Sequence, residues 1–144
     1  MSKVFNNVYL KLKEEYENNP VEEYNSKNLL KNISTTLDNL YKTLLNIELI
    51  LKEISLFDTS TSEDFLNLSY KTIEEIHGHF PKIFFEVQIE ENYPETYLDA
   101  IEELITNVII LRFFLIRLEK EDYKNILSLL DSYIINIKLY TKNY

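Results

Sequence analysis

Apolar residues recur along the chain at steps of three and four, the spacing that places them on one face of an α-helix. The first such stretch carries Val4, Phe5, Val8, Tyr9, Leu12 and Tyr16. The second is more regular, with apolar positions Leu30, Ile33, Leu37, Leu40, Leu44, Ile47, Leu51 and Ile54. We therefore expect an N-terminal helix and then a helix over roughly 27–56 whose buried stripe is a heptad seam, widened near its end by Leu45, Leu49 and Ile50.

The segment 62–78 is expected to form the next helix, because its apolar residues again fall on one face. It ends at "HGHFP", where Gly78, the only glycine of the chain, stands between the only two histidines. Glycine can adopt the left-handed conformation that closes many helices, and a residue that precedes proline is pushed out of the α region. We therefore predict that a left-handed Gly78 terminates this helix.

Two further helices are predicted, over roughly 95–119 and 122–142. The first carries an apolar stripe from Tyr97 to Leu118, but its second half, "VIILRFFLIRL", is apolar nearly all round. Such a segment must be buried on both sides. We expect the N-terminal helix or a second subunit to cover it, which makes a homodimer through the apolar face of 108–118 a possibility.

These patterns predict an all-α fold in a single domain, 1–144, with an antiparallel four-helix-bundle-like core, an additional N-terminal helix and a short connector near 82–90. The single glycine and three prolines support this, because the favoured hairpin turns need glycine or asparagine at positive φ. The connector "KIFFEVQIE" alternates as a strand would, yet a lone strand leaves its backbone groups unpaired. A short helix or ordered connector is favoured, and strand pairing across a dimer is the alternative.

The chain has no cysteine, which fits a reducing compartment, and its start lacks an apolar run of signal-peptide length. The longest apolar run, 108–118, is too short to span a bilayer and contains Arg112 and Arg117. We expect a cytoplasmic protein that does not bind membranes.

Charge is unevenly distributed along the sequence. Residues 61–103 hold eleven acids and two lysines, a balance that equals the net charge of −9 of the whole chain. Concentrated negative charge repels nucleic-acid phosphates and attracts a basic protein, whose association it accelerates. We expect no direct nucleic-acid binding and predict a surface for a basic protein partner composed of Glu74, Glu75, Glu86, Glu90, Glu91, Tyr93, Glu95, Asp99, Glu102 and Glu103.

Candidate chemistry is confined to two places. Glu74 and His77 have the Glu-x-x-His spacing that di-iron bundles use twice, but His79 lies beyond Gly78 and cannot supply a second helical copy. We expect no metal site, no cofactor and no catalytic residues. Arg112, in "IILRFFL", needs a partner because an unpaired buried charge is costly. We favour either an ion pair with a glutamate of a neighbouring helix, such as Glu48, or a side chain that extends to solvent at a helix–helix rim, over the binding of an anionic ligand.

Acid residues beside aromatics recur, as in "EEY", "EDF", "EENY" and "EDY". A small, acidic, helical protein with tyrosines beside carboxylates is similar in character to bacterial immunity and antitoxin proteins, or to phage-encoded inhibitors of host defence. No signature motif is shared, so no residue roles follow from the similarity. We expect a non-catalytic interaction module, an inhibitor of that type; the alternatives are a structural or regulatory helical homo-oligomer and, third, a metal- or small-ligand-binding bundle.

Overall fold

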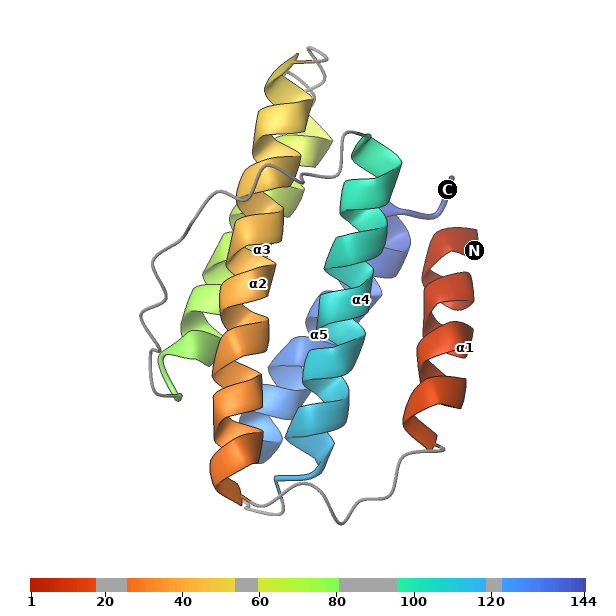
Figure 1. Cartoon of the computed structure of the whole chain (residues 1–144). Coiled ribbons are helices and arrows are strands. Elements are labelled where there is room, and N and C mark those ends of the chain that lie inside the picture. Colours follow the sequence, from red (N-terminus) through yellow and green to blue (C-terminus); the bar gives the residue numbers. More distant parts are fainter. Residues whose placement is uncertain (18–25, 54–59, 81–95, 119–122) are drawn as a thin grey trace.

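The computed structural model describes residues 1–17, 26–53, 60–80, 96–118 and 123–144 (Figure 1). These residues form five helices: α1 (Lys3–Glu17), α2 (Ser26–Glu53), α3 (Ser60–His77), α4 (Tyr97–Ile116) and α5 (Lys124–Tyr140). The all-α fold predicted from the apolar spacing is confirmed. The connector 82–90 lies outside the described residues, so the choice between strand and helix there stays untested.

Helices α2 to α5 form a four-helix bundle. α2 packs against α3 and α4, and α5 packs against the same two helices, so α3 and α4 occupy one diagonal of the bundle. α2 and α5 run in one direction and α3 and α4 in the other, which makes every packed pair in the bundle antiparallel (Figure 1). The C-terminal end of α3 and the N-terminal end of α4 therefore lie at opposite ends of the bundle.

The heptad seam of α2 forms the centre of the core. Six of its positions are buried, namely Ile33, Leu37, Leu40, Leu44, Ile47 and Leu51. Apolar residues on the widened part of the stripe behave differently, because Leu45 and Leu49 are 38% and 54% exposed. Of the residues that widen the stripe, Ile50 alone is therefore buried, and Leu45 and Leu49 remain open to solvent.

The apolar second half of α4 is covered from two sides, by α2 within the bundle and by α1 on its outer side (Figure 1). α1 contributes the buried side chains of Val4, Phe5 and Leu12. The prediction that the N-terminal helix covers this segment is confirmed. Of the face 108–118, Ile116 remains 47% exposed, whereas most of its other apolar residues are buried, so little of it is left for a second subunit to cover.

The position of α1 is secured by the C-terminal residues. The backbone oxygen of Tyr144 accepts hydrogen bonds from the amides of Lys3 at 2.8 Å and Val4 at 3.2 Å. These amides belong to the first turn of α1 and have no partner within the helix. The hydroxyls of Ser2 and Thr141 share a buried hydrogen bond of 2.8 Å. α1 is thus fixed to the end of α5 as well as to the side of α4.

Helix α3 ends without the left-handed glycine that the sequence predicted. The Gly78 amide donates to the carbonyl of Glu74 at 3.0 Å, and the next two amides continue the chain in tighter turns that bond three residues back. Gly78 does not adopt a positive φ, and an added Cβ would come no closer than 3.4 Å to a neighbouring atom. The predicted boundary is confirmed, but the predicted conformation of Gly78 is wrong, because these turns close the helix instead.

None of the described helices combines the length and the hydropathy that crossing a membrane would require.

Candidate functional site

Five of the ten residues of the predicted partner surface lie in described helices. Glu74 and Glu75 are exposed near the C-terminal end of α3, whereas Asp99, Glu102 and Glu103 are exposed in the first two turns of α4. The others lie outside the described residues: Glu86, Glu90, Glu91, Tyr93 and Glu95. The partner surface can therefore be located only through its two helical parts.

The two helical parts do not meet. Because α3 and α4 run parallel on a diagonal of the bundle, Glu74 and Glu75 lie at the end opposite to Asp99, Glu102 and Glu103 (Figure 1). The expectation that two neighbouring helices gather these acids on one side is wrong for the described residues. The physical reason is the direction of the helices: α3 and α4 run parallel, so the last turn of α3 and the first turns of α4 lie at opposite ends of the bundle.

A different set of acids does come together at one end of the bundle. The first turns of α3 and α4 converge on Tyr140 of α5, whose hydroxyl shares hydrogen bonds with Ser62 at 3.0 Å and with Tyr97. This end carries five exposed carboxylates, here called the acidic end: Glu63, Asp64, Asp99, Glu102 and Glu103. The sequence signal for it was the acid pair that precedes Phe65 in α3.

The carboxylates of the acidic end form no ion pair within the described residues. Partial burial raises the pKa of Glu103, because desolvation disfavours its charged form. Leu98, 43% exposed, lies beside Asp99 in the same turn. The acidic end therefore combines carboxylates that form no ion pair with any described residue and an exposed apolar side chain.

Aromatic residues beneath the acidic end point inward and not toward a partner. The ring of Phe65 is stacked on that of Tyr140, with centroids 3.9 Å apart and planes at 3°. Burial, followed by the hydrogen bond with Tyr140, raises the pKa of the Tyr97 hydroxyl, which therefore stays protonated. These rings hold the starts of α3 and α4 in place and leave the carboxylates to form the surface.

The histidine region does not assemble a metal site within the described residues, where no group of three potential ligands occurs. His77 faces α2, and its Nε2 lies 3.6 Å from Oδ1 of Asp38, whereas Glu74 and His79 are exposed. Burial raises the pKa of Asp38, and the neighbouring His77 partly opposes this shift. The sequence contained no sign of this pairing because the two residues belong to different helices.

Arg112 forms the expected ion pair with a neighbouring helix, but with a different partner. Its Nε donates to Oδ1 of Asp131 on α5 at 2.7 Å. The predicted partner Glu48 instead accepts a hydrogen bond from the Tyr70 hydroxyl at 2.8 Å. Arg112 lies on the face of α4 that points toward α5 and α1, and so it cannot reach the face of α2 that carries Glu48.

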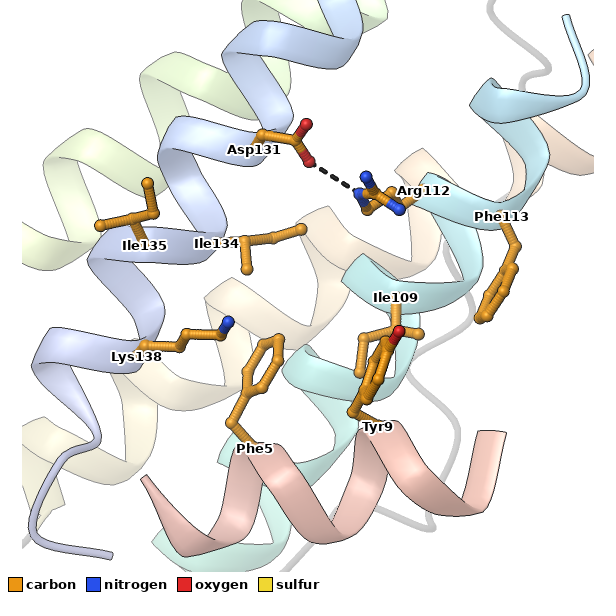
Figure 2. A pocket seen from close by; sticks show the side chains of 9 residues that line it. All are labelled: Phe5, Tyr9, Ile109, Arg112, Phe113, Asp131, Ile134, Ile135 and Lys138. Atoms are coloured by element: carbon orange, nitrogen blue, oxygen red, sulfur yellow. Dashed lines mark hydrogen bonds and ion pairs between the residues drawn. The ribbon is translucent and has the colours of Figure 1, made fainter. Parts of the chain in front are cut away.

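This pair lies at one edge of a cavity of about 350 Å³ between α1, α4 and α5, here called the groove (Figure 2). α1, α4 and α5 each contribute to its lining, which consists of Phe5, Tyr9, Ile109, Arg112, Phe113, Asp131, Ile134, Ile135 and Lys138. Sequence analysis missed the groove, because its apolar residues belong to the stripes that also form the core. The sequence pointed to this region through Arg112 alone, for which the binding of an anionic ligand was the less favoured interpretation.

Comparison with known proteins does not extend these observations. No protein-family model, no curated protein and no solved structure matches the chain.

Proposed function

We propose that the protein is a non-catalytic helical interaction module that binds a basic protein partner through the acidic end, as an inhibitor of the immunity, antitoxin or anti-defence type would. The observation that carries this proposal is the convergence of five exposed carboxylates from α3 and α4, none of them in an ion pair within the described residues. The partner has an arginine- or lysine-rich surface with an apolar centre that meets Leu98.

The charge supports this function through the rate of association. Like charges that converge on one end of a molecule focus its potential, and this accelerates the approach of an oppositely charged protein. The ring stacking and hydroxyl contacts of Tyr140 hold the two helix starts together, so the carboxylates are presented in a fixed arrangement. Preorganisation of this kind lowers the entropic cost of binding.

The experiment compares two charge reversals of equal size at opposite ends of the bundle. The variant Glu102→Lys/Glu103→Lys alters the acidic end, and the matched control Glu74→Lys/Glu75→Lys alters the C-terminal end of α3. A partner is first captured from cells of the source organism with wild-type protein, eluted with salt and identified. Association rates of the purified partner are then measured by stopped flow at low ionic strength.

We expect the acidic-end variant to associate at least about tenfold more slowly than wild type, and the control to stay within about twofold. Equal rates for both variants and wild type would remove the acidic end from the binding surface. Slowing of the control alone would assign the surface to Glu74 and Glu75.

A further inference from the structure

The groove is independent of the acidic end and shares no residue with it. Its walls come from α1 and α5 and its floor from α4, so it forms only because α1 is held alongside the bundle (Figure 2). The hydrogen bonds that hold α1 there, from Lys3 and Val4 to Tyr144, do not involve the groove-lining side chains. A volume of about 350 Å³ is in the range of sites that bind small molecules.

The lining suits a ligand with a large apolar body. Six of its nine residues are aromatic or aliphatic, and Phe5 and Tyr9 stack along α1 with centroids 6.5 Å apart. Ile109 from α4 and Ile134 from α5 face them across the groove in Figure 2. Apolar pockets of this kind bind by removing apolar surface from water, and a few polar groups orient the ligand.

The charged groups of the groove favour one negative charge. Arg112 and Lys138 supply two cations and Asp131 one carboxylate, so the lining has a net charge of +1 in a chain whose net charge is −9. One monoanion would neutralise it. A dianion would leave the lining with a net negative charge, and a cation would increase its positive charge.

The cations have donors left for such a ligand. Arg112 uses its Nε for Asp131, which orients the guanidinium, and its terminal amino groups form no hydrogen bond within the described residues. The Lys138 ammonium lies 4.8 Å from the ring centroid of Phe5 and has no carboxylate partner among the described residues. A guanidinium fork held by one carboxylate can receive a second one with its remaining N–H groups.

We propose that the groove binds an amphipathic monocarboxylate, with the apolar body against Tyr9 and Phe113, the aromatic lining residues that are not buried, and the carboxylate attracted by the two cations of the lining, Arg112 and Lys138. The side chains of Arg112 and Asp131 are 39% and 44% exposed and Lys138 is exposed as well, so the cations are accessible to a ligand that enters from solvent.

The first test varies only the head group of the ligand. Decanoate, the neutral 1-decanol and the cationic decyltrimethylammonium share one apolar tail, and each is titrated below its aggregation limit into the full chain by calorimetry. We expect saturable one-to-one binding of decanoate, at least about tenfold weaker binding of 1-decanol and no binding of the cation. Equal affinity for decanoate and 1-decanol, or no saturation with decanoate, would overturn the proposal.

The second test varies the protein. Lys138→Met should weaken decanoate binding about tenfold and leave 1-decanol binding unchanged, whereas the matched control Lys142→Met, outside the groove, should change neither. Asp131→Asn keeps an acceptor for Arg112 but removes the competing charge, so decanoate should bind several-fold more tightly. Equal losses in Lys138→Met and its control, or weaker binding in Asp131→Asn, would contradict the assignment.

Discussion

The acidic end and the groove hold charge in two different ways. At the acidic end, carboxylates of one sign project into solvent from the first turns of α3 and α4, supported by buried rings. In the groove, two cations and one carboxylate lie among apolar side chains, and one cation is oriented by the carboxylate. Exposed charge of one sign acts at a distance and is screened by salt, whereas charge beside apolar walls acts at contact.

This difference follows from where the residues fall in the helices. Acids at the start of a helix are favoured by the helix dipole and are free to project outward, so two helix starts at one end of the bundle create the acidic end. Arg112, in contrast, lies well inside α4, where its neighbours are apolar, and Lys138 lies in the last turn of α5. Exposed acids at helix starts suit the proposed protein partner, and cations beside apolar side chains suit the proposed small ligand.

The largest expected effect comes from removing a wall of the groove. Phe5→Ala deletes a buried ring that packs α1 onto α4, and it should lower the free energy of unfolding by about 3–5 kcal/mol in urea titrations. Decanoate binding should be lost with it. Because the first turns of α3 and α4 are linked to each other through Tyr140 of α5, partner association should keep its wild-type rate; a slower rate would show that the two regions are coupled.

A smaller effect is expected beneath the acidic end. Tyr140→Phe keeps the stacked ring but removes the hydroxyl that links Ser62 of α3 to Tyr97 of α4. The free energy of unfolding should fall by about 1–3 kcal/mol, since the hydroxyls of Ser62 and Tyr97 each lose a hydrogen bond. Decanoate affinity should not change. Thermal denaturation followed by circular dichroism measures the first quantity, and unchanged stability would show that the hydroxyl does not hold the helix starts together.

Gly78 lies in neither region and allows the protein to be stabilised without altering either. Gly78→Ala should raise the free energy of unfolding by about 0.4–1 kcal/mol, because the backbone is not left-handed and the added Cβ meets no atom closer than 3.4 Å. Both binding activities should stay as in wild type. A loss of stability on this substitution would mean that the turn after α3 requires glycine.

The smallest effect concerns the stability that the folded protein loses when the partly buried carboxyl of Glu103 is ionised. The pKa of Glu103 is raised in the folded state by desolvation, so folding is favoured below its unfolded pKa and this contribution is lost as pH rises through the folded pKa. Glu103→Gln should therefore raise the melting temperature slightly at pH 7 and not at pH 3. Glu102→Gln, which removes a neighbouring exposed carboxylate of the acidic end, is the control and should show a smaller difference between the melting temperatures at the two pH values.

The sequence predicts the features that depend on residue spacing within a single helix, and it does not predict those that depend on how the helices are arranged. The heptad seam of α2 and the burial of the second half of α4 follow from spacing along one helix, and both were predicted. The diagonal placement of α3 and α4 does not, because other helix orders bury the same stripes. That placement decides which acids share a surface, and it separates Glu74 and Glu75 from Asp99 and Glu102.

The groove shows the same limit. Phe5 and Ile134 fit the core stripes of their helices, and no property of either helix alone reveals that α1 and α5 leave a hollow over α4. The pairing of Arg112 with Asp131 was predicted in kind, because a cation within an apolar helix needs a counter-charge. The identity of the partner was not predicted, because the choice between Glu48 and Asp131 depends on which helix the arginine faces.

The salt dependence of partner association tests the central claim, that the acidic end is the docking surface, most directly. Association rates of wild type, Glu102→Lys/Glu103→Lys and Glu74→Lys/Glu75→Lys are measured from low to high ionic strength. We predict that the wild-type and control rates fall together as salt rises and converge at high salt on the slow rate of the acidic-end variant. A wild-type rate that does not change with salt, or a control that is as slow as the acidic-end variant at low salt, would contradict this account.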